Sequence, residues 1–432
     1  MTHRLVALAG LVAAVSLGAC AQTALPRADA ARLEGRIEAL SQFGANEDGG
    51  VDRVAYSDAD LAGRDWIMGE MEALGLADIH IDAGGNITGR RAGTDGDAKP
   101  IMFGSHIDSV LGGGNYDGPA GVLTALEAVE LLNEADIATR SPLDLIVFAN
   151  EEGGLIGSLA LTGRLSPGAF RVVSDSGYTI EEGTKRIGGD LSQMANDVIS
   201  KGDLKGFVEL HIEQGAFLEE ENIDIGVVQG IVGIEWWDVT LRGMPNHAGT
   251  TPMNRRRDAL LAAAKLTQAV NEVATGMEGR QVATVGRIEA FPGAPNVIPG
   301  RVEMSLEVRD LETERIEQVY DEITARANAI SAESGVEISF ERLELASEPA
   351  LTDPAIRDAI AAAAEDLGLS YKFMPSGAGH DAQDMAGVAP TGMIFVPSKG
   401  GISHSPEEFT SAQDLANGAD VIVRALLAID AF

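Results

Sequence analysis

Cysteine is almost absent from this 432-residue chain, in which Cys20 is the only one. A single cysteine cannot form an internal disulfide, and the rest of the chain has no thiol for catalysis or metal binding. Basic residues are also scarce, because 32 lysines and arginines face 66 acidic residues, for a net charge of −34. Such a surface repels phosphate backbones, so we expect no nucleic-acid partner. The acidity otherwise indicates solubility and says little about a substrate.

One apolar run, residues 5–19, stands near the start of the chain and ends in small residues at Cys20. Its length and basic flank are typical of an export signal, and it is too short to predict a transmembrane helix. The four residues ending at Cys20 resemble a bacterial lipobox. We therefore predict a signal peptide (1–19), a tether (20–31) and an exported, periplasmic lipoprotein anchored to the outer membrane through Cys20. An ordinary cleaved signal is the alternative.

Strand and helix patterns alternate along residues 32–228 and 346–432. Buried strands are predicted at 100–104, 143–149, 206–210 and 393–397, and helices from about Arg32, at 118–133 and at 354–367. Alternating strands and helices predict an α/β layer fold, in which ligands lie at the carboxyl ends of the strands.

The segment 229–345 has a different pattern. Its predicted strands are 235–241, 283–288, 302–308 and 336–340, and its predicted helices are 257–273 and 312–333. The order β-α-β-β-α-β is that of a ferredoxin-like α+β unit, and the length suits an inserted domain. We therefore expect a catalytic α/β domain in two parts, interrupted by this insertion.

Histidine is scarce too, and the few that are present lie in conspicuous places. Beyond residue 19, five of six histidines lie in short glycine-rich or acidic motifs: His106, His211, His247, His380 and His404. Three of these motifs, together with the Glu151-Glu152 pair, follow predicted buried strands. A histidine at a strand end is commonly a structural residue, and a glutamate pair is commonly solvated surface. Their joint occurrence at strand ends favours a hydrolytic metal site instead.

Two divalent metals bridged by one carboxylate can activate a shared water and polarise a carbonyl. The candidate ligands are His106 and His211 for one metal, Glu152 and His404 for the other, and Asp117 as the bridge. Glu151 is then free to act as the general base. Asp108, two residues after His106, is expected to orient the His106 ring.

Four further motifs carry a family resemblance: His211–Gly215, Asn246–Met253, Pro295–Pro299 and Gly377–Ala382. Together they resemble the hydantoinase/carbamoylase branch of the zinc-dependent aminoacylase and carboxypeptidase superfamily, over residues 32–430. The branch includes N-carbamoyl-L-amino-acid hydrolases, β-ureidopropionases and allantoate amidohydrolases. The resemblance implies a zinc-exopeptidase-like catalytic domain (32–228 and 346–432) with a ferredoxin-like dimerisation and lid domain (229–345).

The resemblance also implies roles for single residues, with the ligands and base on the residues named above. Gln214 is expected beside the metals, and Gly379 and His380 in the substrate pocket. His247 is expected to stabilise the oxyanion of a partner subunit's substrate, and Asn296 with Arg309 to hold the α-carboxylate, also across the dimer. The alternatives are an Arg309 ion pair with Asp310 or Glu307, a structural turn histidine at 247 and a hydrogen-bonded loop residue at 380.

The resemblance therefore implies a homodimeric amidohydrolase with two divalent metal ions, Zn or Mn, which Co or Ni could replace in vitro. Its expected reaction is cleavage of the carbamoyl C–N bond of an N-carbamoyl-L-amino acid or a related ureido acid. A dipeptidase or aminoacylase and a catalytically silent periplasmic binding protein are the alternatives. Family members are usually cytoplasmic, so the predicted export favours scavenging of extracellular nitrogen compounds.

Overall fold

The computed structural model describes residues 25–343 and 347–432. The predicted signal peptide, Cys20 and the first part of the tether lie outside the described residues. Within the described ranges, no helix is both long and apolar enough to cross a membrane. The first helix, α1 (Ala30–Ser41), starts two residues before the predicted position, because the Asp29 carboxylate accepts hydrogen bonds from the amides of Ala31 and Arg32.

The main sheet has nine strands, eight of them in the order β1-β2-β4-β3-β5-β16-β6-β14, with β15 beside β6. Their bounds are β1 (Ala77–Ile81), β2 (Ile87–Arg91), β3 (Ile101–His106), β4 (Leu143–Phe148), β5 (Gly206–Ile212), β6 (Ile225–Ile231), β14 (Ala350–Leu351), β15 (Tyr371–Ser376) and β16 (Thr391–Val396). Strands β4, β3, β5 and β16 are neighbours and run parallel. Their carboxyl ends therefore meet at one edge of the sheet.

Helices cover both faces of the main sheet, which explains why every residue of its four central strands is buried. In β3, Ile101 and Phe103 join the core formed with α1, α3 and α11, whereas Met102 joins the core formed with α10. The remaining helices are α2 (Asp58–Ala73), α3 (Pro119–Glu134), α4 (Ile156–Leu161), α5 (Ile180–Arg186), α6 (Phe217–Glu221), α9 (Pro354–Leu367), α10 (Asp381–Met385) and α11 (Ala412–Ala431), and short 3₁₀ helices lie at Ala169–Arg171, Leu191–Asn196, Met253–Arg255 and Lys399–Gly401.

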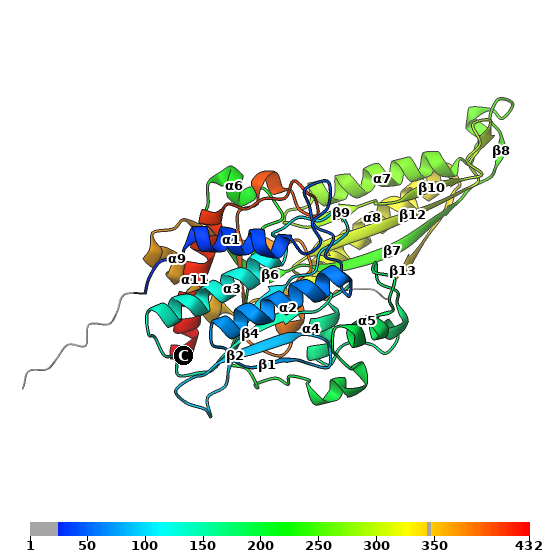
Figure 1. Cartoon of the computed structure of the whole chain (residues 1–432). Helices are drawn as coiled ribbons and strands as arrows, with labels where there is room; N and C mark the ends of the chain where they lie inside the picture. The colour runs from blue at the N-terminus through cyan, green and yellow to red at the C-terminus, as the bar shows by residue number, and fades with distance from the viewer. Residues whose placement is uncertain (1–24, 344–346) are drawn as a thin grey trace, which may run out of the picture.

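A second unit, defined here as residues 233–342, projects from the main unit (Figure 1). Its sheet has the order β10-β12-β7-β13, with β9 also beside β12. The elements are β7 (Gly233–Arg242), α7 (Ala259–Gly276), β9 (Val282–Thr284), β10 (Ile288–Phe291), β12 (Arg301–Asp310), α8 (Thr313–Ser334) and β13 (Glu337–Arg342). Residues of β12 alternate between buried and half-buried, because α7 and α8 cover only one face. A separate two-stranded sheet pairs β8 (Asn246–His247) with β11 (Val297–Ile298).

The predicted fold class, an α/β domain with a ferredoxin-like α+β insertion, is confirmed. One predicted strand, 283–288, is divided between β9 and β10. Between them, the Arg287 amide donates to the Ser305 hydroxyl and the Ser305 amide donates to the Arg287 carbonyl, so a side chain replaces part of the strand ladder. A side-chain contact of this kind has no signature in the hydrophobic pattern.

Candidate metal centre

Four parallel strands of the main sheet deliver polar side chains to the same edge. His106 ends β3, His211 lies in β5, Glu151 and Glu152 follow β4, and His404 lies on the loop after β16. Asp117 precedes α3, which begins with Gly118 as its N-cap and Pro119 as its first residue. Because the carboxyl ends of these parallel strands meet at one edge, residues as much as 298 positions apart in the sequence (106 to 404) lie close together.

The five predicted metal ligands form two groups that share Asp117. One oxygen of Asp117 lies 3.1 Å from Nε2 of His211 and 3.9 Å from Nε2 of His106. The other oxygen lies 3.2 Å from Nε2 of His404, which is 3.5 Å from a carboxylate oxygen of Glu152. A carboxylate with one oxygen in each group has the arrangement that a ligand bridging two metal ions requires. We call these five side chains the ligand cluster.

Unsatisfied polar atoms in the ligand cluster fit divalent cations. Within the described residues, Nε2 of His106, Nε2 of His211 and Oε1 of Glu152 are buried without a hydrogen-bond partner. The other ring nitrogens are occupied, since Nδ1 of His106 lies 3.1 Å from the Asp108 carbonyl and Nδ1 of His211 lies 2.9 Å from the Ile212 carbonyl. Hydrogen bonds of this kind place the proton on Nδ1 and leave the Nε2 lone pair for a metal.

Gly118 shapes the cluster because it allows the close approach of the His106 ring. Its φ of 80° lies in a region that side chains rarely adopt, and a Cβ at this position would overlap the His106 imidazole. A glycine is therefore required at the turn that joins Asp117 to α3.

Asp108 contacts both the His106 ring, as the sequence suggested, and the Glu151-Glu152 segment. Its two carboxylate oxygens accept hydrogen bonds from the amides of Glu151 and Glu152, both at 3.2 Å. The carboxylate lies 3.6 Å from Nδ1 of His106, so the backbone carbonyl of Asp108 is the closer partner of that ring. Asp108 thus orients His106 through its backbone and the Glu151-Glu152 segment through its side chain.

Glu151 lies beside the ligand cluster without belonging to either group. It is 8% exposed, and its carboxylate is 3.7 Å from Nε2 of His106. Burial raises the pKa of Glu151 well above its usual range, nearby carboxylates including Asp381 add to this shift, and His106 opposes it. A buried carboxyl with a raised pKa can both accept and return a proton near neutral pH.

The carboxylates and histidines of the ligand cluster shift one another's pKa values. Burial raises the pKa of Glu152 to about 7, and the hydrogen bond to Asp117 raises that of His404 to about 9. Burial works against ionisation of Asp117, but His211 and His404 hold its pKa well below the usual range. Asp117 is therefore ionised, and its negative charge lies between the histidines of the two ligand groups.

The model of peptidase family M20/M25/M40 matches residues 102–428 of this chain. The chain belongs to this family. An N-carbamoyl-L-amino acid amidohydrolase of Geobacillus stearothermophilus is 40% identical over 396 residues, 90% of this chain and 96% of that protein. An allantoate amidohydrolase of Bacillus subtilis is 38% identical, over 90% of this chain and 94% of that protein.

A crystal structure of a hydantoinase/carbamoylase family amidase from Burkholderia multivorans is similar to this M20-family chain with a TM-score of 0.87. That protein is 37% identical, and the match covers 94% of this chain and 99% of the other. The resemblance to the hydantoinase/carbamoylase branch is therefore confirmed.

Two predicted substrate residues of this M20-family member lie next to the ligand cluster. The Gln214 amide donates to Asp117 at 2.7 Å, and its carbonyl oxygen is buried without a partner in the described structure. The His380 ring centroid lies 4.5 Å from that of His211. Nε2 of His380 lies 2.7 Å from the Ser376 hydroxyl, so His380 makes the hydrogen bond expected of a structural loop residue. Gly379 precedes it and is half-buried.

His247 and Asn296 lie far from the ligand cluster, at the distal end of the second unit. Figure 1 shows β8, which contains His247, at the end of that unit farthest from the main sheet. Both residues are exposed, and they are neighbours because the Ala248 amide donates to the Asn296 carbonyl. Nδ1 of His247 accepts from the amides of Gly249 and Thr250, which leaves the ring proton on Nε2.

Arg309 lies at the opposite end of β12 from Asn296. The strand has 10 residues, which at ~3.3 Å per residue separates its ends by roughly 30 Å. The predicted Asn296–Arg309 pair is therefore not brought together within one chain. Arg309 makes the alternative ion pair with Glu307 at 2.7 Å, and it also donates to the Gly377 carbonyl at 2.7 Å. Arg309 therefore contacts the segment of its own chain that leads to His380, since Gly377 is three residues before it in the sequence.

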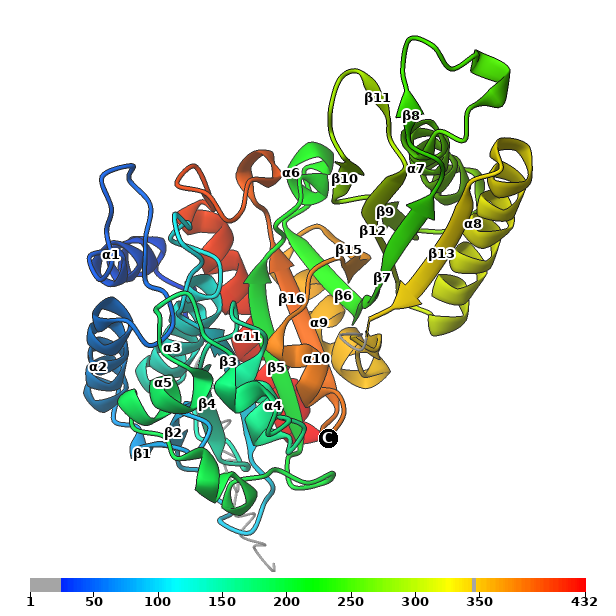
Figure 2. The same cartoon turned by 90° about the vertical axis from the view of Figure 1, so that its right-hand side faces the viewer.

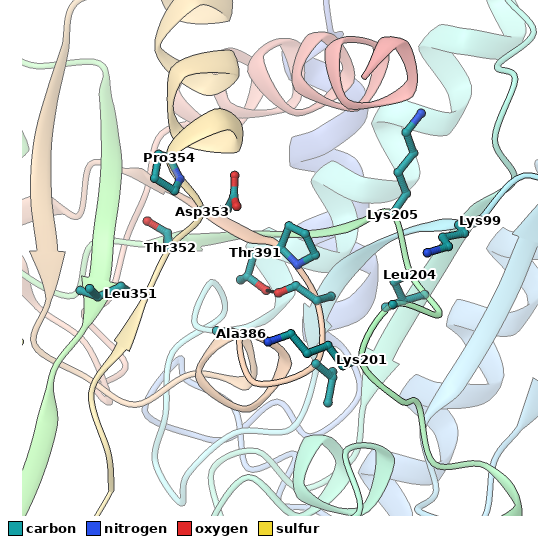
Figure 3. Close-up of a pocket in the computed structure, with 14 residues that line it drawn as sticks. Lys99, Lys201, Leu204, Lys205, Leu351, Thr352, Asp353, Pro354, Ala386 and Thr391 are labelled. Carbon is teal, nitrogen blue, oxygen red and sulfur yellow. Dashed lines mark hydrogen bonds between the residues drawn. The ribbon is translucent and has the colours of Figure 1, made fainter.

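A cavity of about 640 Å³ lies elsewhere, at the amino-terminal edge of the main sheet. Figure 3 shows Lys99 and Lys201 extending into it, beside Thr352, Asp353 and Thr391. Lys99 and Lys201 precede β3 and β5, and Thr391 begins β16, whereas Thr352 and Asp353 lie between β14 and α9. The metal ligands lie at the other ends of β3, β5 and β16, so the cavity is separate from the ligand cluster.

Two residues of the site were not predicted from the sequence. The Ser403 hydroxyl lies 2.7 Å from Asp117, and the Glu408 carboxylate contacts the loops of both Asp117 and His404. Both lie in the motif around His404, and that proximity is the signal that could have identified them.

Proposed function

We propose that this protein is a metal-dependent amidohydrolase that cleaves the carbamoyl C–N bond of N-carbamoyl-L-amino acids or a closely related ureido acid. The observation that carries the proposal is the pair of ligand groups that share Asp117, with Glu151 beside them. Relatives named as N-carbamoyl-L-amino acid and allantoate amidohydrolases, matched over about nine-tenths of the chain, support the substrate class.

The mixed nitrogen and oxygen donors suit two Zn²⁺ or Mn²⁺ ions, with Co²⁺ or Ni²⁺ as replacements in vitro. His106 and His211 would hold one ion, Glu152 and His404 would hold the other, and Asp117 would contribute to both groups. When bound, such ions polarise a carbonyl oxygen and lower the pKa of water.

In the proposed reaction, Glu151 accepts a proton from the attacking water. The Nε2–H of His247 donates a hydrogen bond to the developing oxyanion. Glu151 then returns the proton to the leaving nitrogen, so that an N-carbamoyl amino acid yields the amino acid, CO₂ and ammonia. The hydrogen bond from Gln214 to Asp117 orients the shared carboxylate, and Gly379 and His380 border the substrate.

The second unit, with the wider boundaries 229–345, acts as the dimerisation and lid domain between the catalytic segments 32–228 and 346–432. Because His247 and Asn296 lie at its distal end, they serve the active site of another copy in a homodimer. Arg309 serves its own chain's site, a role supported by its hydrogen bond to the carbonyl of Gly377, three residues before His380 in the sequence. This division modifies the expectation that Asn296 and Arg309 act together across the dimer.

Export and anchoring are supported by the apolar run at residues 5–19 and the lipobox-like sequence ending at Cys20. In this proposal the enzyme is a periplasmic lipoprotein that scavenges nitrogen compounds. Mass spectrometry of the mature N-terminus tests it. A diacylated or triacylated Cys20 supports the anchor, and an unmodified N-terminus contradicts it.

The decisive experiment measures ammonia release by the signal-less protein with Zn²⁺ or Mn²⁺. Substrates are N-carbamoyl-L-amino acids, β-ureidopropionate and allantoate, with dipeptides and N-acetyl amino acids scored by free amine. Chelator-sensitive ammonia from a ureido compound supports the proposal. Amine release from dipeptides or acyl amino acids alone favours a peptidase or aminoacylase, and binding without turnover favours a silent binding protein.

A further inference from the structure

Glu408 is a buried carboxylate with hydrogen-bond donors on both of its oxygens. It is 3% exposed. One oxygen accepts from the amides of Tyr116 and Asp117, at 2.8 and 2.9 Å. The other accepts from the Ser403 hydroxyl at 3.0 Å and from the His404 amide at 3.3 Å. Each oxygen thus contacts a different loop.

These contacts join two loops that are distant in sequence, since Glu408 and Asp117 are 291 positions apart. One loop carries Asp117, which both ligand groups share, and the other carries His404. His404 has a φ of 53°, a conformation that costs a side-chain-bearing residue about 1–3 kcal/mol unless its surroundings hold it. Its amide hydrogen bond to Glu408 is one such restraint.

We propose that Glu408 is a positioning residue that fixes the spacing between Asp117 and His404, and thereby sets the metal affinity of the group Asp117, Glu152 and His404. The inference rests on the proposed function, because it concerns the same two metal ions. His106 and His211 lie in β3 and β5, where strand pairing holds their backbones, so their group depends less on Glu408.

The neighbouring residue provides a matched control. Glu407 is exposed, and within the described residues its carboxylate has no hydrogen bond or ion pair. Glu408→Gln keeps the shape of the side chain but removes one acceptor, because the amide NH₂ must face two of the four donors. Glu407→Gln makes the same chemical change one residue away.

The test is calorimetric titration of metal-free wild-type, E408Q and E407Q proteins with Mn²⁺ and with Zn²⁺. We expect E408Q to bind one of two metals about 10–100-fold more weakly, the range for partners of metal ligands, and the other metal within a fewfold of wild type. E407Q should match wild type. Excess metal should restore the kcat of E408Q with KM unchanged, which a general folding defect would not allow.

Unchanged affinity at both sites of E408Q would overturn the inference, as would equal weakening of both sites with a lowered thermal unfolding midpoint. A wild-type protein that binds no metal refutes the proposed function itself, which is a separate result. If E408Q does not fold, Gly114→Ala is the second variant, because a Cβ at Gly114 would overlap the Glu408 side chain and displace it. It should show the same selective loss, and retention of both affinities would again overturn the role.

Discussion

The ligand cluster and the distal end of the second unit differ in how far one chain assembles them. At the carboxyl edge of the main sheet, His106, Asp117 and His211 are buried, and the Asp117 carboxylate lies within 4 Å of Nε2 of each histidine. At the distal end, His247 and Asn296 are exposed, and their partners are local backbone groups. Figure 2 shows the second unit at the upper right, projecting away from the main unit. The ligand cluster is thus assembled within one chain, whereas the roles that we propose for His247 and Asn296 require another copy of the chain.

Substitution of Glu151, beside the ligand cluster, has the largest expected effect. Glu151→Gln removes the carboxylate that accepts the proton. It keeps the hydrogen bond that the backbone N–H of residue 151 donates to the Asp108 carboxylate. We expect kcat to fall by about 10²–10⁴-fold, the usual contribution of a general base. Metal content by elemental mass spectrometry should stay at the wild-type value, because Glu151 is not a ligand. Loss of metal together with activity would instead make Glu151 a ligand.

The two halves also differ in what the sequence could predict. Most of the ligand cluster could be predicted from the sequence, because the motifs of His106, Glu152, His211 and His404 follow predicted buried strands and ligands lie at the carboxyl ends of such strands. Asp117 instead precedes a predicted helix. The strand that separates Asn296 from Arg309 was predicted at 302–308, close to the observed bounds of β12, Arg301–Asp310. The two residues were paired by the family resemblance and not by the strand pattern. The roles of Asp108 and Glu408 depend on backbone amides supplied by distant loops, which leave no signature in residue type.

Substitution of His247 tests the proposed role of the distal end of the second unit. We expect His247→Ala to lower kcat by about 10²–10³-fold, as loss of one oxyanion donor does. His80 is an exposed histidine on β1 and serves as the matched control, so H80A should keep wild-type activity. Full activity in H247A would limit His247 to its turn-stabilising hydrogen bonds.

Coexpression of E151Q and H247A chains with different affinity tags then asks where His247 acts. If it serves another copy's site, the purified heterodimer contains one site with both Glu151 and His247 intact, and activity returns. A heterodimer as inactive as its parents would place His247 in its own chain's site.

Arg309, unlike His247, is expected to act in the site of its own chain. Its guanidinium is held by Glu307 and Gly377 on its own chain. Arg309→Lys loses the fork geometry for a carboxylate, and loss of a charged hydrogen bond of about 1.5–3 kcal/mol predicts a roughly 10–100-fold lower kcat/KM, chiefly through KM. Arg287, in an exposed ion pair with Asp238, provides the control R287K. A heterodimer of E151Q and R309K chains should stay impaired, and recovery there would show that Arg309 acts across the dimer.

The smallest expected effect, about tenfold per pH unit for each proton, concerns the pH dependence of metal binding by Glu152 and His404. In the metal-free protein the pKa of His404 is raised to about 9 and that of Glu152 to about 7. Both groups therefore hold a proton below these values, and metal binding must displace it. Affinity for the metal held by Glu152 and His404 should rise with pH, by up to about tenfold per unit for each proton displaced, and level off near pH 9. Calorimetry in buffers of different ionisation enthalpy counts the released protons directly. A proton count near zero at pH 7 would mean that His404 is neutral before the metal arrives, so that Asp117 does not charge it in the manner its 3.2 Å contact implies.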